Sequence, residues 1–520
     1  MIIDSLMLFT ILSGVGLVGA ESYSAIMSSR RKKIDKVGTA YVADTDIVDK
    51  LSGNDGLIIS KDIQLGFNAD REGVCILGPT GSGKTTSFFF PNLLKNNMTG
   101  SIIVTDPKGE LFEKTSKFQE EVCGRKVYKF CPLNPEDSEY YNILTECKDT
   151  SEVLQLASML LFNGSLSIEL QTGKKAGGVE WIQMAEPLFA ASLLYAKEQE
   201  YPFNTVEFAL ELIVNLDTDS LYKIFSNAKN PDVMKQYRTF LTVGGADRTE
   251  GSIKITLATN LKLFNDPKIN QVSSKTTFDI ETFRKVPSIL YIIYPERKSS
   301  YISPFIAPFF SQAIDKLLDT FEEDNSLNIH MLFDEFANIG MLNNMSGNAA
   351  TCRSRNISLS VCLQSISQLF QVYGAYNAKA ILNNLKTKVV LPGLNDEDTL
   401  RYISSLCGET EITTKTYNME KGMHETYSKS KKRLFENGEI RTLKDDEMLV
   451  VCHNKQPILD LQLRYYKHKE FTNNIEKRTL WTKKRNLQKF DYSNKIMDLK
   501  LETMIVDDEE DAEGLDFRES

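Results

Sequence analysis

The chain has 520 residues, enough for roughly three to four domains at about 150 residues each. Its hydrophobic content of 42% and charged content of 25% are ordinary for globular proteins, which excludes a disordered, collagen-like or multi-span membrane chain. The formal net charge is -9, but residues 501–520 contain nine acidic residues and one basic residue, so the remainder is nearly neutral at -1. Any contact with nucleic acid must therefore come from local basic patches or from the lumen of a ring.

The first apolar segment is an uncharged run at residues 6–20, followed by the basic cluster of residues 30–33. A helix that crosses a bilayer needs about 20 residues, so residues 1–5 would have to contribute to it. Because the basic residues follow the run, we expect a single-pass anchor with the rest of the chain in the cytoplasm. A cleaved signal sequence and an interfacial helix are the alternatives. We assign residues 1–36 to the anchor with its basic flank and residues 37–64 to a linker.

Past the anchor, short apolar runs alternate with helical patterns, which is typical of an α/β fold with a mostly parallel sheet covered on both faces. The predicted strands are Val74–Leu77, Ile102–Thr105, Ile289–Tyr294, Ile329–Phe333, Leu359–Leu363, Lys388–Leu391 and Met448–Val451. Two stretches of the chain, residues 65–147 and 281–470, would build this core.

The stretch between these two parts, residues 148–280, has a different pattern. Its apolar residues recur at spacings of three and four, as at Trp181, Met184, Leu188 and Tyr195. A loop between a strand and a helix is not this long, so the pattern predicts an inserted all-α domain. At the other end of the chain, residues 471–520 are first basic and then acidic, which predicts a charged, disordered tail outside the core.

A phosphate-binding loop follows the first predicted strand. Its residues are Gly78, Pro79, Thr80, Gly81, Ser82, Gly83, Lys84 and Thr85. The glycines let backbone N–H groups converge on phosphates, and the helix that begins after the loop presents its positive N-terminus. Lys84 would reach the β- and γ-phosphates, and Thr85 would offer its hydroxyl to Mg²⁺. We include Thr86 in the predicted nucleotide-binding set.

Two adjacent carboxylates end a later predicted strand. Asp334 directly follows Ile329–Phe333, where a Walker B motif carries the carboxylate that holds Mg²⁺. Glu335 would polarise the attacking water, which nucleotide-hydrolysing motors need and simple switches do not. The alternative interpretation is a solvated pair of turn residues.

Three further polar residues surround the strand that follows. Gln364 ends Leu359–Leu363, where it would sense the γ-phosphate and move the helix that begins near Ser365. Arg353 and Arg355 precede that strand, and Arg353 would reach a neighbouring subunit's nucleotide as an arginine finger. The alternative is that both arginines are ordinary surface residues.

Together these motifs resemble a family. The residues that carry the resemblance are Gly78–Thr85 followed by Pro91-Asn92-Leu93-Leu94, the stretch Val104–Leu111, Asp334-Glu335-Phe336 and Leu363-Gln364-Ser365. They are similar to the type IV secretion coupling proteins, the TraG/TraD-like conjugation ATPases, over about residues 65–470. One departure is that the family typically carries two membrane helices, whereas one is visible here.

The resemblance implies a RecA-like P-loop NTPase core, an inserted all-α domain and an N-terminal transmembrane helix in the bacterial cell membrane. It implies ATP and Mg²⁺ as cofactors, with Lys84, Thr85, Asp334, Glu335, Gln364 and the trans finger Arg353 in the roles given above. It also implies a homo-hexamer that couples single-stranded DNA, delivered as a relaxase complex with accessory proteins, to the secretion channel during conjugative transfer. The alternatives are a docking receptor without motor activity and an FtsK-type double-stranded DNA translocase, although residues 471–520 are too short and too charged for the latter's winged-helix domain.

Surfaces that would bind the DNA or the protein partners are less distinct in the sequence. A basic group lies in a polar stretch that begins near Glu409, and its members are Lys429, Lys431, Lys432 and Arg433. It would contact phosphates as a loop, and a solvated hairpin tip is an equal alternative. The acidic end cannot bind DNA directly, so it would attract a basic protein or only keep the tail soluble.

Overall fold

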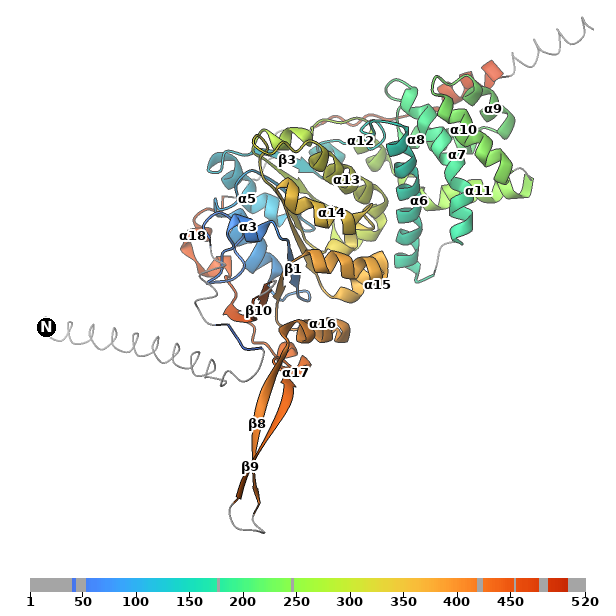
Figure 1. The fold of residues 1–520 in the computed structure, drawn as a ribbon. Helices are drawn as coiled ribbons and strands as arrows, with labels where there is room; N and C mark the ends of the chain where they lie inside the picture. The colour runs from blue at the N-terminus through green and yellow to red at the C-terminus, as the bar shows by residue number, and fades with distance from the viewer. Residues whose placement is uncertain are drawn as a thin grey trace, which may run out of the picture.

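The structure is a computed structural model that describes residues 40–43, 53–174, 178–244, 247–418, 424–452, 455–476 and 485–503. The predicted membrane anchor at residues 1–36 and most of the acidic end lie outside the described residues. Figure 1 shows a core built on a β-sheet, a helical domain beside it and a β-hairpin that projects from the core.

A nine-stranded sheet forms the centre of the core, with the order β11-β10-β7-β1-β6-β5-β2-β4-β3. From β7 to β3 all neighbouring strands are parallel, and β10 and β11 extend one edge in antiparallel pairs. The strands are β1 (Val74–Leu77), β2 (Ser101–Thr105), β3 (Lys126–Phe130), β4 (Ser288–Ile292), β5 (Ile329–Phe333), β6 (Ile357–Leu363), β7 (Thr387–Val390), β10 (Glu447–Cys452) and β11 (Ile458–Leu461). The predicted mostly parallel sheet is therefore confirmed, and each predicted strand is present within one or two residues of its expected bounds.

Two strands of the sheet, β3 and β11, were not predicted. Both lie at an edge of the sheet, and both mix buried side chains with more exposed ones, in strict alternation in β11 only. The predicted strands are continuous apolar runs, which are typical of strands buried on both faces. The two edge strands are only partly buried and lack such a run, so this criterion does not identify them.

Helices cover both faces of the sheet. Cys75 and Leu77 of β1 belong to one apolar cluster, whereas Val74 and Ile76 belong to a second. The first cluster is covered by α13 (Ser299–Asp319), α14 (Met345–Cys352), α15 (Ile366–Asn384), α16 (Glu397–Cys407) and the short α17 (Asn437–Arg441). The second is covered by α3 (Phe67–Asp70), α4 (Phe90–Leu93), α5 (Glu110–Glu121) and α18 (Lys469–Thr472).

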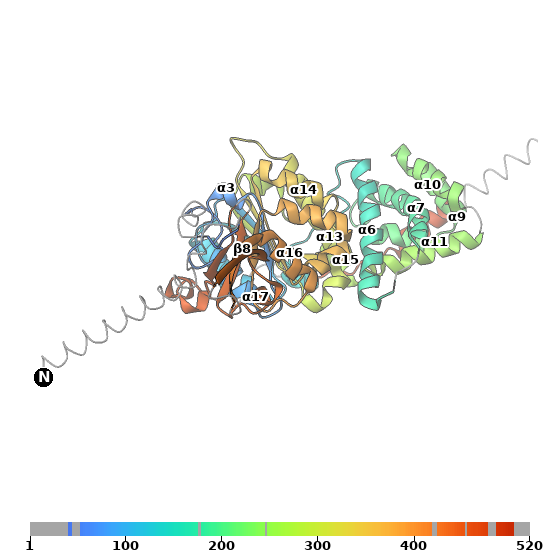
Figure 2. The ribbon, with the colours of Figure 1, turned by 60° about the horizontal axis from the view of Figure 1, so that its bottom comes forward.

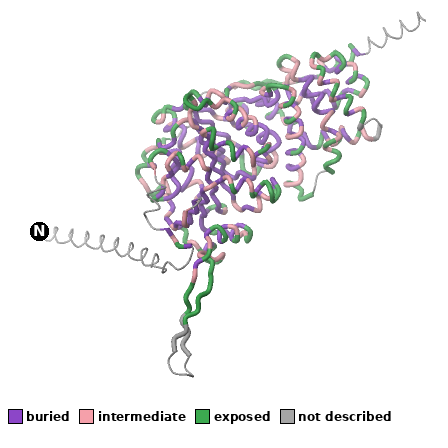
Figure 3. Tube along the Cα trace, viewed as in Figure 1, coloured by how far each residue is buried: buried purple, intermediate pink, exposed green. Residues whose placement is uncertain are grey.

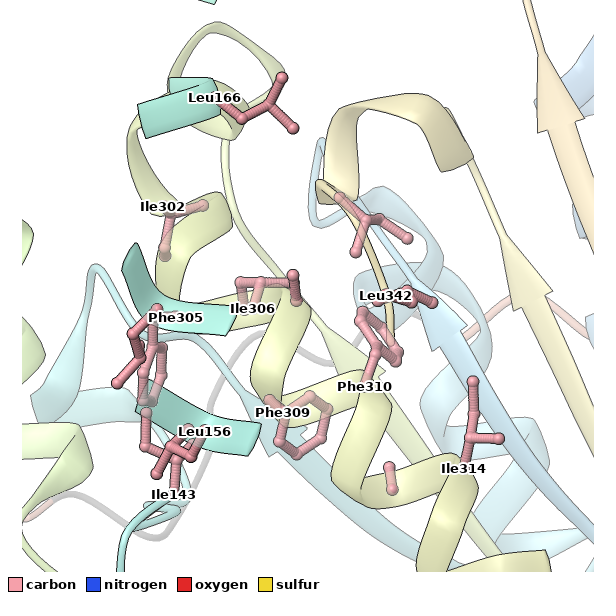
Figure 4. Close-up of a cluster of buried hydrophobic side chains, with 14 of the residues drawn as sticks. Ile143, Leu156, Leu166, Ile302, Phe305, Ile306, Phe309, Phe310, Ile314 and Leu342 are labelled. Carbon is pink, nitrogen blue, oxygen red and sulfur yellow. The ribbon is translucent and has the colours of Figure 1, made fainter. Parts of the chain in front are cut away.

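Between β3 and β4 the chain forms the helical domain at one end of the molecule (Figures 1 and 2). Its helices are α6 (Thr150–Thr172), α7 (Val179–Glu198), α8 (Val206–Asn215), α9 (Thr218–Ser226), α10 (Pro231–Gly244), α11 (Asp247–Asn260) and α12 (Pro267–Ser273). We call this the all-α domain. Its helix α6 packs against α13 of the core through a cluster that includes Leu156, Leu166, Phe305 and Phe309 (Figure 4).

The same helix α6 bears on the question of membrane spans. Among the described residues, α6 alone has the length and apolarity to cross a bilayer, with a mean hydropathy of 1.4 over a window that is 50% buried inside the protein. Its contacts with α7, α11 and α13 account for that apolarity.

A two-stranded hairpin of β8 (Glu409–Asn418) and β9 (His424–Arg433) projects from the core, and most of its side chains whose burial is described are exposed, although Thr410 near its base is buried (Figure 3). The predicted basic group lies on β9, where its residues pair with Glu409–Thr413 of β8 at the base of the hairpin, so it forms neither a loop nor a hairpin tip. Lys429 and Arg433 pair with Glu411 and Glu409 of β8 at 3.8 Å each. These exposed pairs already offset part of the positive charge that a phosphate would meet.

The end of the described chain differs from the expectation of a tail outside the core. Tyr492, Ile496 and Leu499 are buried, and residues 493–503 are helical. Tyr492 packs on Phe203 and Phe208 of the all-α domain, with ring centroids 6.0 and 5.5 Å apart. These apolar residues recur at spacings of three and four and form one face of the helix. The charged residues between them led to the prediction of a disordered tail.

Candidate active site

The predicted phosphate-binding loop begins where β1 ends. Gly81 and Gly83 have φ angles of +84° and +107°, which favour glycine over every other residue. A Cβ on Gly83 would also lie 2.4 Å from Oε1 of Gln462, so a side chain at this position would have to displace the end of Gln462. The loop continues directly into helical turns at Thr85–Phe89 and α4, and their N-terminal end faces the loop.

The two predicted carboxylates follow β5, which is separated from β1 by β6 alone. Because the three strands are parallel, their carboxyl ends meet at one edge of the sheet. Lys84 Nζ lies 2.6 Å from Oε1 of Glu335 and 2.9 Å from the carbonyl oxygen of Gly78. The structure thus brings together the loop lysine and the predicted catalytic glutamate, which are far apart in the sequence.

Asp334 is held beside these two residues by β2, the strand that pairs with β5 on the side away from β6. Its backbone N–H donates to Oγ1 of Thr105, the last residue of β2, at 2.6 Å. Burial raises the pKa of Asp334 to about 7, and the neighbouring carboxylate of Glu335 adds to the rise, while Lys84 opposes it. Desolvation therefore favours a neutral Asp334, and a cation at this carboxylate would favour its ionised form.

The residues present fit a divalent cation. Asp334 Oδ1 is buried and accepts no hydrogen bond from any described residue, so it retains an open lone pair. Thr85 lines the same cavity with its hydroxyl-bearing side chain. A carboxylate and a hydroxyl are oxygen ligands, which Mg²⁺ prefers together with phosphate oxygens and water.

These groups surround a cavity of about 190 Å³ at the carboxyl edge of the sheet. It is lined by Pro79, Thr80, Gly81, Gly83, Lys84, Thr85, Thr86, Pro107, Lys108, Glu110, Glu296, Asp334 and Glu335. Sequence reasoning missed Glu110 and Glu296. Glu296 follows β4 closely, so a polar residue shortly after a parallel strand was the signal that could have found it.

A second cavity of about 640 Å³ lies on the other side of the phosphate-binding loop. It shares Pro79, Thr80 and Gly81 with the first cavity and adds the loop residue Ser82. The residues that face the loop across this cavity are Pro392, Gly393, Arg441, Leu443, Asp445 and Arg464. None of these was predicted, because they come from three separate segments that only the fold joins.

Gln364 and Arg353, the last two predicted site residues, lie at opposite ends of β6. Gln364 directly follows Leu363, whose carbonyl oxygen accepts from the backbone N–H of Gly78 at 3.0 Å, so it lies beside the start of the loop. Arg353 lies before the amino end of β6, which is about 20 Å from the carboxyl edge at the rise of a β-strand. There Arg353 pairs with Glu72 at 2.9 Å, and its side chain is 60% exposed. Within one subunit, the structure does not bring Arg353 to Lys84 or Glu335.

Asp106 and Lys108 follow β2 directly and have different surroundings. From the sequence, Pro107 and Gly109 predict a turn at the end of a strand that leaves Asp106 and Lys108 near the nucleotide, with a plain polar turn as the alternative, and Lys108 does line the first cavity. Asp106 instead turns into the protein, where its carboxylate accepts from the backbone N–H of Phe112 at 2.8 Å. Burial raises the pKa of Asp106 to about 6, although the N–H groups at the start of α5 oppose the rise. Its observed contacts are those of a residue that fixes α5.

Comparisons with known proteins identify relatives of the chain. The family described as "Type IV secretory system Conjugative DNA transfer" matches residues 29–488. The chain is 25% identical over 408 residues to protein VirD4 of Rhizobium rhizogenes, covering 77% of this chain and 59% of that protein. It is 24% identical over 373 residues to the conjugal transfer protein TraG of Escherichia coli, covering 66% of this chain and 56% of that protein. The chain thus spans under two thirds of the length of these relatives.

Solved structures share the fold. The plasmid coupling protein TrwB in complex with the ATP analogue ADPNP superposes with a TM-score of 0.62 at 17% identity, covering 82% of this chain and 93% of that one. TrwB in complex with ADP and Mg²⁺ gives a TM-score of 0.60 at 17% identity. The family match extends over most of the chain and includes both the phosphate-binding loop and Asp334-Glu335. The chain therefore belongs to the type IV secretory system conjugative DNA transfer family, the family of the type IV coupling proteins.

Proposed function

We propose that this chain is a membrane-anchored ATPase that recruits a relaxase–DNA complex and couples it to a type IV secretion channel during conjugative DNA transfer. The observation that carries the proposal is the buried contact of Lys84 with Glu335, at 2.6 Å, inside a chain that matches the family over residues 29–488. The nucleotide complexes of TrwB and the name of the conjugal transfer protein TraG support it.

The chemistry follows from the positions of the side chains. Lys84 binds the β- and γ-phosphates, and the backbone N–H groups of residues 80–85 surround them. Thr85 and Asp334 hold Mg²⁺, which when bound neutralises charge on the phosphate oxygens. Glu335 accepts the proton of the attacking water, which it can do once its contact with Lys84 is released.

The second cavity gives room for the rest of the nucleotide. The first cavity, at about 190 Å³, is smaller than the roughly 300 Å³ at which ligand pockets begin, so it suits phosphates alone. The loop residues Pro79, Thr80 and Gly81 border both cavities. A nucleotide that crosses the loop there would place its ribose and base toward Arg441 and Arg464.

The assembly is a homo-hexamer in the bacterial cell membrane, anchored by residues 1–36 with the ATPase domain in the cytoplasm. In it, Arg353 acts on the nucleotide of the neighbouring subunit, since its own site is out of reach. Gln364 adjoins the loop and is joined to α15 through Ser365, so it senses the γ-phosphate and moves that helix. Single-stranded DNA, the relaxase with its accessory proteins and the channel components are the partners.

The test is ATP turnover by the purified full-length chain in detergent micelles, with and without single-stranded DNA, over a range of protein concentrations. Turnover that rises with DNA, and more steeply than in proportion to protein, is the expected result. Lys84→Ala serves as the negative control, because it removes the ammonium group that binds the phosphates. Nucleotide binding without turnover under every condition would instead indicate a docking receptor, and stimulation by double-stranded DNA alone would indicate a translocase of the FtsK type.

A further inference from the structure

The residues that follow Glu335 are held by the all-α domain. We call residues 335–343 the Walker B loop. Asn163 lies in the middle of α6 and is 1% exposed. Its Oδ1 accepts from the backbone N–H of Met341 at 2.8 Å, and its Nδ2 donates to the carbonyl oxygen of Met341 at 3.0 Å. One side chain of the all-α domain therefore satisfies both backbone groups of one residue in the Walker B loop.

The fit at this contact is close. Gly340 has a φ of +100°, and a Cβ at this position would lie 2.7 Å from Oδ1 of Asn163. Glu335 itself adopts the left-handed conformation, with φ 53°, which is uncommon for a residue with a side chain. Such a conformation persists where the surrounding structure holds it in place. The Walker B loop is thus set at both ends, by Glu335 at the active site and by Met341 against α6.

Two core helices hold the same loop. Tyr373 of α15 accepts from the backbone N–H of Leu342 at 3.2 Å, and its ring stacks on Phe336 with an interplanar angle of 4°. Ser311 of α13 accepts from the backbone N–H of Asn343 at 3.0 Å. Leu342 joins the apolar cluster between α6 and α13 (Figure 4). A shift of α6 relative to α13 and α15 must therefore change the path of the loop, since a packed interior has few voids to absorb it.

From this geometry we propose that Asn163 is a positioning residue that couples the all-α domain to Glu335 through the Walker B loop. The inference rests on the proposed ATPase function and adds the route by which a partner bound to the all-α domain changes turnover. Coupling is reciprocal, so a nucleotide at the phosphate-binding loop must also alter the all-α domain. Asn163→Ala removes the contact with Met341 but does not substitute Lys84, Asp334 or Glu335.

Ser167 provides a matched control on the same helix, one turn further along. It is 3% exposed and donates to the carbonyl oxygen of Ser300 in α13, so Ser167→Ala also removes a buried hydrogen bond between α6 and the core. It does not touch the Walker B loop. A loss of function that came only from a weakened domain contact would appear in both variants.

The first measurement is hydrogen exchange of the full-length chain with and without ADP and Mg²⁺. In the wild type and in Ser167→Ala, nucleotide should change exchange in α6 and α7, and in Asn163→Ala this change should be lost. Exchange at residues 336–343 without nucleotide should rise in Asn163→Ala alone. A nucleotide-dependent change that persists in α6 and α7 of Asn163→Ala would overturn the proposal, and this result does not depend on whether the chain hydrolyses ATP.

The second measurement is steady-state ATP turnover with single-stranded DNA. Asn163→Ala should lower kcat roughly ten- to a hundred-fold, because a displacement of a reacting group by about 1 Å costs up to about 10²-fold. Its KM for ATP should change by less than about three-fold, since the residues that bind the phosphates are intact. A wild-type kcat in Asn163→Ala, or an equal loss in Ser167→Ala, would contradict the positioning role. Absence of turnover in the wild type would refute the ATPase proposal instead, and the exchange experiment would still decide the coupling.

Discussion

The ammonium group of Lys84 and the carboxylate of Glu335 form a buried ion pair at 2.6 Å, with side-chain exposures of 7% and 10%. In the proposed function, the phosphates and the attacking water need these same two groups. A γ-phosphate that binds Lys84 would compete with Glu335 and would release its carboxylate toward solvent in the cavity. Nucleotide binding and activation of the general base would thereby be linked through one contact.

The first prediction concerns stability. Lys84→Ala should lower the free energy of unfolding by about 3–5 kcal/mol, because it leaves the carboxylate of Glu335 buried without a counter-ion. Adding Glu335→Gln to Lys84→Ala should recover part of this loss, since the remaining side chain is neutral. Denaturant unfolding of the single and double variants measures both effects. Equal stability of Lys84→Ala and the double variant would show that the unpaired carboxylate of Glu335 costs no stability.

The second prediction concerns catalysis. Glu335→Gln should bind ATP at least as tightly as the wild type, because Lys84 no longer has a competing partner, and its kcat should fall by about 10²-fold or more. Nucleotide titration and steady-state turnover check the two parts. Glu296→Gln is the control, since it removes a negative charge from the same cavity on an exposed side chain. Undiminished turnover in Glu335→Gln would exclude this residue as the base.

The third prediction concerns the subunit interface. Arg353→Ala should lower turnover by about 10³-fold or more if the arginine completes a neighbour's site. Mixing Arg353→Ala with Lys84→Ala should restore part of the activity, because each supplies what the other lacks at a shared site. Glu72→Ala removes the partner of Arg353 within the subunit and should leave turnover unchanged. A mixture no more active than its separate components would place Arg353 outside the active site.

The fourth prediction concerns pH and the C-terminal segment. Burial raises the pKa of Glu207 to about 7, against the hydrogen bonds that Tyr492 and Asn270 donate to it. Because folding raises this pKa from its ordinary value of 4.5 to about 7, the carboxyl of Glu207 is protonated in the folded chain but ionised in the unfolded chain at pH values between these two. The stability that the protonated carboxyl contributes is complete below pH 4.5 and is lost as the pH rises through about 7.

Glu207→Gln keeps a neutral hydrogen-bonding side chain at all pH values. It should therefore stabilise the chain by about 1–2 kcal/mol at pH 8 relative to the wild type and give little gain near pH 5. Thermal unfolding at both pH values measures the difference. Glu200→Gln, on an exposed side chain nearby, should show no such dependence. A pH-independent difference for Glu207→Gln would mean that the carboxyl titrates at its ordinary value.

Much of the candidate active site can be predicted from the sequence because its parts are local. The phosphate-binding loop is one contiguous segment, and Asp334-Glu335 directly follows an apolar strand, so each was identified without knowing its neighbours. Gln364 likewise directly follows an apolar strand, and the pairing of β1 with β6 places it beside the start of the loop. Polar residues that line the second cavity from other segments, such as Arg441 and Arg464, carry no local signal of that role.

The sequence by itself determined the type of the buried strands and of the long helices, because these elements leave a periodicity or an apolar run in the residues that form them. It also determined the phosphate-binding loop, because glycines, lysine and hydroxyl must be adjacent there. Only the tertiary structure decided which distant residues meet. Lys84 and Glu335 are 251 positions apart, and Asn163 and Met341 are 178 apart. Contacts of this kind depend on the order in which strands pair and helices pack, and no local pattern records that order.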